Sequence, residues 1–503
     1  MVNVIKSLRT HQEKARRLGQ EIHSGALTDK VVCAYVTPGG GKTLMASLLA
    51  HEVLKRDCSR VLFLCPRDAL RTQNRDGFHV PTLGLLGGLV AGFVSSKSLF
   101  RAERAGCVAT YQDVLANPAR WLKFVEEEDT LVILDEGHHL PAGPVANLEN
   151  EEEAGWTQVV RPIVEAAKRV LLMTGSKRRS GGEPIAFLSY GDNREPLFHI
   201  EYSRRDALEE HAILNVSAQL CDGEAKYWHS FTGEHRHRLS QVGAEEESRA
   251  RRALLDSDDY RTSMVRLALD DLGKYRSTRN PRARAIVICN TQAHARSVFE
   301  SIREDGSYRP ILAISTEPHA ASRIARFRDR GEGEVLVTVG MAYEGLDVPD
   351  CTHLICLSNN RARSWLEQAL SRVTRVDRAC SLSWEEQAAY IYVPNDPSMV
   401  QFLSEWIEEQ PGAFVDPPVP RDGGVGEAEA RRRGVLVSQA GELDGIKYAD
   451  TYGVFSSIDQ RRIFAVKLRF PFLAACAAKE LLDIGRQCWS DDVDVPSSEA
   501  AAE

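Results

Sequence analysis

Two stretches of this chain repeat one pattern, in which short apolar runs alternate with segments of helix length. In residues 30–200 the runs are VVCAYV, RVLFLCP, CVAT, LVILDE and RVLLMTGS; in residues 283–395 they are ARAIVICN, ILAIS, EVLVTVG, THLICLS and AYIYVP. Strands that are apolar along their whole length are buried on both faces, as in parallel sheets covered by helices. We therefore predict an α/β fold with two parallel-sheet domains in tandem.

The rest of the chain is organised around these two domains. We predict an N-terminal domain at 1–212, a helical connecting segment at 213–280 and a second α/β domain at 281–410. The Pro/Gly-rich run at 411–434 is typical of a linker. Residues 435–503 form a small C-terminal segment with an acidic tail.

The composition excludes several classes of protein. With 43% apolar and 27% charged residues, the 503-residue chain is neither a disordered polypeptide nor a collagen. Its longest apolar stretch, residues 83–94, is too short to span a bilayer and carries four glycines. The first residues, MVNVIKSLRTHQ, lack the apolar core of a signal peptide. We therefore expect a cytoplasmic protein with no membrane partner.

Neither the cysteines nor the histidines predict a structural metal site. The eleven cysteines contain no CxxC pair, and several lie in β-branched runs, where a free thiol behaves as a small apolar residue. His229, His235 and His237 form the other candidate cluster, and we interpret it as a solvated polar loop.

The first apolar run leads directly into the loop TPGGGKT and then into a helical pattern, LMASLLAHEVL. Glycines let backbone N–H groups turn toward a polyphosphate, and the start of a helix favours an anion. An ordinary glycine-rich turn is the alternative, and Val36 stands where the general pattern has glycine. The expected contacts are Gly39, Gly40, Gly41, Lys42 for the β/γ-phosphates and Thr43 for Mg²⁺.

An acidic pair follows the buried run LVIL. Parallel sheets bind ligands at the carboxyl ends of their strands, which is where Asp135 and Glu136 stand. Asp135 is placed to hold the metal ion, and Glu136 to accept a proton from an attacking water. His138 would sense the γ-phosphate or link to the second domain. A helix N-cap is the alternative interpretation of such a pair.

Taken together, these residues resemble the superfamily 2 helicases over residues 5–395. VTPGGGKT is similar to motif I of that family, and Asp135-Glu136-Gly137-His138 to a DEAH box with glycine in place of alanine. The continuation KRRSGGEPIAFLSYG resembles the type III restriction subunit-like (ResIII) branch. The resemblance implies two RecA-like domains that hydrolyse ATP, with Mg²⁺, in the cleft between them.

The resemblance also implies roles for residues outside the phosphate loop. Gln12 looks like the adenine contact of the Q segment, and Thr174-Gly175-Ser176 like motif III. Cys289-Asn290-Thr291 stands at the motif IV position. Motifs Ia and Ib would contact the nucleic-acid backbone through Pro66, Arg67 and Thr110, and Thr338 is a further candidate for such a contact.

Motifs V and VI would complete the nucleotide site from the second domain. Gly345 and Asp347 belong to the first of these, and Gln368 to the second. Gln368, Arg372 and Arg375 are spaced to share one helix face, so the arginines could act as arginine fingers.

We therefore expect an ATP-dependent helicase or translocase that acts on DNA rather than RNA. The net charge of −8 is compatible with this, because three acidic segments hold 13 carboxylates and the remainder carries +5. Three alternatives stay open: a double-strand DNA translocase of a restriction or phage-defence system, an RNA helicase, and a nucleotide-gated scaffold without turnover. The C-terminal segment could bind protein partners.

Overall fold

The computed structural model describes most of the chain. The described residues are 8–54, 57–68, 70–71, 74, 106–143, 151–179, 183–229, 233–329, 332–340, 346 and 348–408, with short strands at 442–443, 446–447 and 452–453. The chain divides into two compact units, Met1–Glu210 and His211–Glu503, and each is described by itself. The predicted linker at 411–434 lies outside the described residues, as does most of the predicted C-terminal segment.

The first unit is built on a parallel sheet with the strand order β3-β2-β4-β5-β1-β8. Five of these strands are the apolar runs of the sequence, and they are buried along almost their whole length, as strands covered on both faces must be. β8 extends the sheet beyond β1 and was not predicted. The strands are β1 (Val31–Val36), β2 (Arg60–Cys65), β3 (Gly106–Thr110), β4 (Thr130–Leu134), β5 (Arg169–Thr174) and β8 (Ile200–Tyr202), with a small hairpin of β6 (Ser189–Tyr190) and β7 (Pro196–Leu197).

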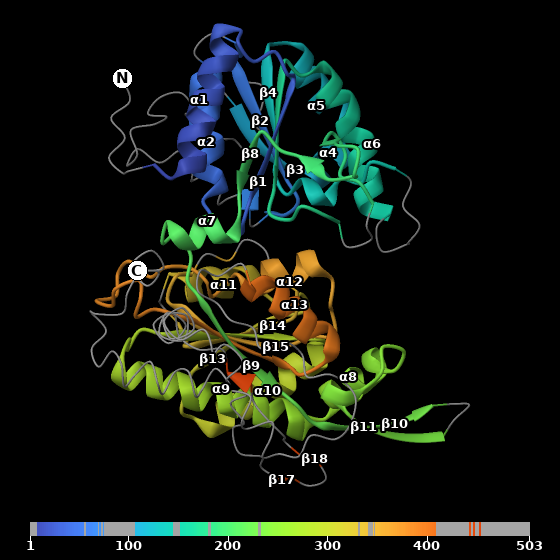
Figure 1. Ribbon diagram of the computed structural model, residues 1–503, viewed down its shortest axis with the longest axis vertical. Coiled ribbons are helices and arrows are strands. Elements are labelled where there is room, and N and C mark those ends of the chain that lie inside the picture. The colour runs from blue at the N-terminus through green and yellow to red at the C-terminus, as the bar shows by residue number, and fades with distance from the viewer. Residues whose placement is uncertain are drawn as a thin grey trace, which may run out of the picture. The chain divides into compact units, whose positions relative to one another are not determined.

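Helices cover both faces of this sheet. α1 and α2 lie together on one face, and α4, α5 and α6 lie on the other (Figure 1). Local signals set several helix starts: Thr110 and Ser203 each form a capping box with an aspartate three residues later. The helices are α1 (Thr10–Ser24), α2 (Lys42–Val53), α4 (Tyr111–Ala116), α5 (Pro118–Glu126), η2 (Gly137–His139), α6 (Glu151–Ala166) and α7 (Arg204–Glu209).

The second unit repeats the plan with the order β13-β14-β12-β15-β16-β9-β19, in which only the β19–β9 pair is antiparallel among the described strands. The five apolar runs of the second stretch form five of these strands, so the prediction of two parallel-sheet domains is confirmed. The strands are β9 (Val216–Cys221), β12 (Arg284–Cys289), β13 (Pro310–Ala313), β14 (Val335–Thr338), β15 (Cys351–Leu357), β16 (Ala389–Pro394) and β19 (Tyr452–Gly453), and β17 (Glu442–Leu443) pairs with β18 (Ile446–Lys447).

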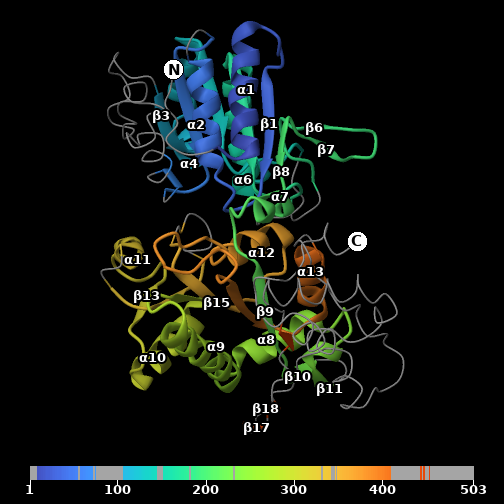
Figure 2. The same cartoon turned by 60° about the vertical axis from the view of Figure 1, so that its left-hand side comes forward.

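Two apolar cores pack this second sheet between helices. α9 and α10 cover one face, while α11, α12 and α13 cover the other, as Figures 1 and 2 both show. Phe327, Leu366 and Met399 are fully buried on the second face. The helices are α8 (Glu247–Asp256), α9 (Asp258–Thr278), α10 (Gln292–Asp305), α11 (Ala320–Arg328), α12 (Arg363–Leu370) and α13 (Pro397–Glu408), with the short turn η4 (Leu239–Gln241).

The connecting segment 213–280 is only partly helical, which corrects the expectation of a wholly helical segment. α8 and α9 fill its second half, but β9 joins the second sheet beside β16. Next to β9 in the chain, β10 (Glu224–His229) and β11 (Gly233–Arg238) form an antiparallel hairpin. The hairpin was missed because its strands are mostly polar and carry little hydrophobic signal.

The described cysteines are free thiols, and all but Cys380 are buried. Burial raises the pKa of Cys33, Cys107 and Cys289 to about 12. Among the described helices, none combines the length and the apolar character that crossing a bilayer requires.

Candidate functional site

The predicted phosphate loop and acidic pair meet at the carboxyl edge of the first sheet. β1, β5 and β4 are consecutive in the strand order, and all three run in the same direction. Their carboxyl ends therefore bring together three loops: residues 37–41 after β1, Asp135 and Glu136 after β4, and Gly175 after β5.

The loop after β1 has the backbone of a phosphate cradle. Gly39 and Gly41 have φ of 88° and 95°, a region that side chains other than glycine rarely adopt. Gly41 is the N-cap of α2, so the unpaired N–H groups of that helix point into the loop. Gly40 is needed for space, because a Cβ there would lie 2.7 Å from Cγ1 of Val36.

Lys42 faces both carboxylates of the acidic pair. Its Nζ bonds to Oε1 of Glu136 and lies 3.9 Å from Oδ1 of Asp135. The side chains are 15% exposed for Lys42 and 7% for Asp135, so solvent screens the pair weakly. A nucleotide phosphate would compete with Glu136 for the ammonium group.

A buried amide joins the two residues predicted to bind Mg²⁺. Thr43 Oγ1 donates to Asn74 Oδ1 at 2.9 Å, and Asn74 Nδ2 donates to Asp135 Oδ2 at 3.2 Å. The Thr43 hydroxyl and the Asp135 carboxylate are therefore bridged by the side-chain amide of Asn74. They are the hard oxygen ligands that Mg²⁺ prefers, so the donor set fits this ion. Asn74 belongs to no motif, so sequence reasoning missed it.

Burial raises the pKa of Asp135 to about 6, against the opposing charge of Lys42. Its backbone carbonyl accepts a 2.7 Å hydrogen bond from the hydroxyl of Tyr111, which is fully buried. A buried carboxylate held by a neighbouring cation is an arrangement that functional sites use to tune charge.

Glu136 links the acidic pair to the loop after β5. It has a left-handed backbone with φ of 51°, an unusual conformation for a non-glycine residue. Its Oε2 accepts from the N–H of Gly175 at 3.2 Å and lies 3.5 Å from Nδ1 of His138. The same His138 nitrogen is 3.2 Å from Oγ1 of Thr174. Glu136 therefore contacts Gly175 directly and Thr174 through His138, and both residues belong to the segment that resembles motif III.

The start of α1 contacts the phosphate loop from the other side. Arg9 Nη1 donates to the carbonyl of Gly40 at 2.6 Å, and the Arg9 N–H donates to Oε1 of Gln12 at 3.1 Å. The side-chain nitrogen of Gln12 is 2.9 Å from where a Cβ of Gly41 would be. Gln12 therefore lies beside the loop and is held there by Arg9, a residue of the Q segment for which no role was predicted.

His11 is a pH-sensitive element of this contact. Its ring packs against that of Tyr202 in a tilted arrangement, with centroids 3.9 Å apart, and the residue is 1% exposed. Burial, and then the charge of Arg9, lower the pKa of His11 to about 4.

The first unit is therefore expected to lose stability as the pH falls from 7 to 5. The unfolded chain takes up a proton at His11 near pH 6.5 but the folded chain does so only near 4, so the loss grows toward pH 4. At pH 5 it amounts to roughly 2 kcal/mol, measured as the free energy of unfolding. His11→Phe, which keeps the ring, should flatten this part of the profile; an unchanged profile would contradict the assignment.

The motif VI residues of the second unit do not share one helix face, which corrects the prediction. α12 ends at Leu370, and Arg375 lies in an isolated β-bridge with Ile213. Arg372 is 7% exposed, and its guanidinium donates to the carbonyls of Gln368 at 3.0 Å and Leu346 at 3.1 Å. Of the predicted contacts in motif V, Gly345 and Asp347 lie outside the described residues.

The four predicted nucleic-acid contacts have different environments. Arg67 is exposed at the end of β2, whereas Pro66 is buried. Thr110 caps α4 by accepting from the N–H of Asp113 at 3.0 Å, which gives its hydroxyl a structural role. Thr338 is fully buried, and its hydroxyl has no hydrogen-bond partner within the part of the chain that the structure describes.

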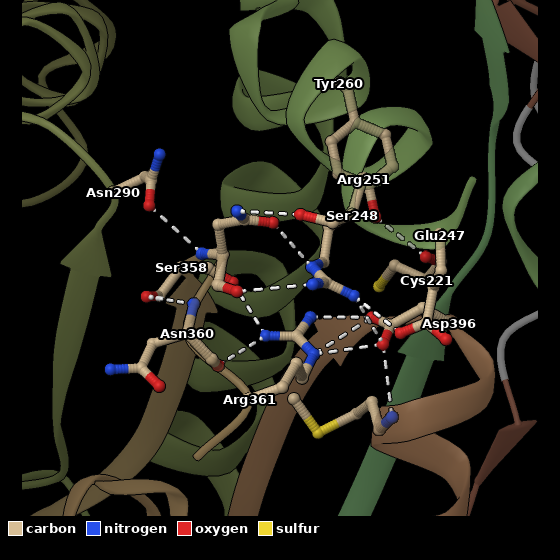
Figure 3. Close-up of polar contacts among 12 residues, drawn as sticks. Cys221, Glu247, Ser248, Arg251, Tyr260, Asn290, Ser358, Asn360, Arg361 and Asp396 are labelled. Carbon is tan, nitrogen blue, oxygen red and sulfur yellow. Dashed lines mark hydrogen bonds and ion pairs between the residues drawn. The ribbon is translucent and has the colours of Figure 1, made fainter. Parts of the chain in front are cut away.

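A buried ionic cluster occupies the carboxyl edge of the second sheet (Figure 3). Asp396, just after β16, accepts from Arg251 at 3.0 Å and from Arg361 at 2.6 Å, and Arg251 also donates to Glu247 at 2.7 Å. Asp396 is fully buried. Since Arg251 lies on α8, the cluster fastens the connecting segment to the sheet.

Comparisons with known proteins agree with this architecture. Residues 5–177 match the family described as the type III restriction enzyme, res subunit, and residues 266–377 match the helicase conserved C-terminal domain. An uncharacterized protein of Mycobacterium leprae is 27% identical over 435 residues, which cover 85% of this chain and 68% of that protein. The chain spans 57 to 68% of the length of the curated relatives it matches.

Two solved structures share the fold. A fragment assigned as an HsdR subunit of a type I restriction enzyme from Vibrio vulnificus YJ016 is 18% identical with a TM-score of 0.52, covering 80% of this chain and 66% of that one. Dbp5 of S. cerevisiae, bound to RNA and ADP BeF3, is 15% identical with a TM-score of 0.51, covering 83% of this chain and 91% of that one.

Proposed function

We propose that this chain is a superfamily 2 motor of the type III restriction subunit type, which uses ATP to unwind or move along DNA, because residues 5–177 and 266–377 match the two family models of such proteins. One observation carries the proposal. Lys42, Asp135 and Glu136 meet beside a glycine cradle at the carboxyl edge of the first sheet. This edge is where parallel sheets bind nucleotides.

The roles follow from the contacts of each residue. Lys42 holds the β/γ-phosphates of ATP, and Thr43 and Asp135 hold Mg²⁺, which neutralises phosphate charge when bound. When a phosphate replaces Glu136 as the partner of the Lys42 ammonium group, the carboxylate of Glu136 can accept a proton from the attacking water. Its bond to the N–H of Gly175 then passes the change to the loop after β5.

The second unit supplies further groups in this proposal. Arg372 and Arg375 stabilise the negative charge that develops on the phosphates, and Gly345, Asp347 and Gln368 contact the nucleotide. Arg372 would first have to release the carbonyls of Gln368 and Leu346. Arg372 would thus become available only with a local rearrangement at the end of α12.

We propose that the nucleic acid binds through its backbone. Arg67 supplies an exposed positive charge, Pro66 and Thr110 belong to the segments that resemble motifs Ia and Ib, and Thr338 is a further candidate contact. Contacts of this kind bind without reading sequence and weaken as salt is raised. Protein partners would bind through residues 435–503.

The test compares ATP turnover with single-stranded DNA, duplex DNA and RNA, each at two salt concentrations. Stimulation by DNA above RNA supports the proposal. Stimulation by RNA alone would make the protein an RNA helicase. Absence of turnover under all conditions would make it a nucleotide-gated scaffold.

A translocase that does not separate strands is the second candidate, favoured by the match of residues 5–177 to the type III restriction enzyme family. Displacement of a third strand from a triplex, without separation of a duplex, would identify this activity. Duplex unwinding would exclude it.

Gln12→Ala is expected to remove the preference for adenine. The residue lies beside the phosphate loop, and one lost hydrogen bond to the base costs about 1 kcal/mol, or roughly a fivefold rise in KM for ATP. KM for GTP and kcat for ATP should change much less. Glu13→Ala on the same helix is the matched control. Equal changes for both nucleotides would show that Gln12 supports the loop without reading the base.

A further inference from the structure

The hairpin β10–β11 brings metal-binding side chains together outside the nucleotide site. The hairpin is labelled in Figures 1 and 2. In its register Tyr227 pairs with His235 and Ala225 with His237. His235 and His237 are two residues apart on one strand, so their side chains lie on the same face. The sequence had favoured a solvated loop here; the structure has a regular strand pair instead.

The two imidazoles and one carboxylate converge. Nε2 of His237 is 3.4 Å from Nδ1 of His235, which in turn is 3.8 Å from Oε2 of Glu246. The ligand atoms of the three residues all lie within 4.8 Å of one another, and all three side chains are partly buried. No other group of this kind was found among the described residues.

We propose that His235, His237 and Glu246 bind one divalent transition-metal ion, with Zn²⁺ the best match. Zn–N bonds of 2.0–2.1 Å at tetrahedral angles place two ligand nitrogens about 3.3 Å apart. The two histidine nitrogens are 3.4 Å apart, which matches the separation of two nitrogens bound to one zinc ion. Three protein ligands leave the fourth position to water or another ligand.

The surroundings of Glu246 suit a metal ligand. The hydroxyl of Tyr227 donates to Oε2 of Glu246, and Arg249 Nη1 lies 3.6 Å from Oε1. Carboxylates that bind metals are commonly oriented by such outer hydrogen bonds. Imidazole nitrogen with carboxylate oxygen is also a donor set that favours zinc over Mg²⁺, which takes oxygen ligands.

The ion would join two parts of the connecting segment. Glu246 is the N-cap of α8, and the histidines lie on β11. α8 is itself fixed to the second sheet by the Arg251–Asp396 contact. Metal binding would therefore fasten the hairpin to the sheet through α8, independently of ATP turnover.

The test uses the full chain, stripped of metal with EDTA and then titrated with Zn²⁺ in excess Mg²⁺, so that the ATP site does not contribute. We expect one zinc ion per chain. His235→Ala and His237→Ala should each weaken binding at least 10- to 100-fold, the loss seen when only an outer partner of a ligand is removed. His319→Asn is the matched control, because His319 is exposed, lies outside the cluster and has a left-handed φ that asparagine tolerates.

Two further readouts make the outcome decisive. With Co²⁺ in place of Zn²⁺, visible bands without thiolate charge-transfer absorption support ligation by histidine and carboxylate rather than by cysteine. Hydrogen exchange in residues 224–238 should slow on zinc addition in the wild type and not in the variants. The proposal would be overturned if the wild type bound no zinc, or if a variant that carries both His235→Ala and His237→Ala bound zinc as the wild type does.

Discussion

Lys42→Ala is expected to lower the nucleic-acid-stimulated ATPase rate by roughly 10²–10⁴-fold, from the size of electrostatic contributions at phosphate-transfer sites. The ammonium group lies between Asp135 and Glu136, and it is the positive charge that the loop presents to the phosphates. Its removal also leaves two neighbouring carboxylates facing a polyphosphate without compensation. Steady-state phosphate release is the measurement.

Glu136→Gln separates chemistry from binding. The amide still accepts from the N–H of Gly175 but is no longer a base, so kcat should fall by about 10²–10⁴-fold while ATP binding persists. Lys30→Ala is the control: Lys30 is exposed at the other end of β1 and donates to the carbonyl of Glu165. Near-wild-type turnover in both site variants would refute the assignment of this edge as the ATPase site.

Asp396→Ala is expected to destabilise the second unit by about 3–5 kcal/mol, the usual cost of removing one partner from a buried ion pair. Burial raises the pKa of Asp396, but the charges and hydrogen bonds of Arg361 and Arg251 outweigh this effect, so the pKa lies below its ordinary value. The carboxylate is therefore charged, and without it the guanidinium of Arg361 loses its carboxylate partner, while the buried guanidinium of Arg251 keeps Glu247 but loses its second carboxylate. Its acceptor bond from the N–H of Met399 at the start of α13 is also lost.

Peptide-resolved hydrogen exchange in urea measures this loss for the second unit alone. Asp329→Ala removes an exposed carboxylate paired with Arg328 and should cost less than about 1 kcal/mol. Equal effects of the two variants would mean that the buried cluster contributes no more than a surface pair.

Much of the fold was predictable because its strands are buried on both faces and are therefore apolar throughout. β8 is too short to give such a signal, and β10 and β11 are mostly polar. The end of α12 was missed for another reason. Leu366, Leu370 and Val373 keep a helical spacing and are all fully buried, although the helix stops at Leu370. The helical spacing of apolar residues indicates which of them are buried. It does not show where the helix ends, because Val373 is buried in the core although it lies in the turn after α12.

The candidate site divides in the same way. Lys42, Thr43 and Asp135 were predictable because each residue lies within a short motif next to a strand. Asn74 and Arg9 were not, since their roles depend on tertiary contacts with Asp135 and Gly40. A lone asparagine or arginine carries no such information in one sequence.

The burial of the cysteines has a consequence for labelling chemistry. The thiolate is the form that reacts with maleimides, and the buried thiols are held protonated and shielded from reagents. Within the described residues, Cys380 alone is partly exposed. Among the described cysteines it therefore offers one attachment point for a fluorophore, in a turn between α12 and β16, without removal of the eight buried cysteines, once Cys476 and Cys488, which lie outside the described residues, have been replaced.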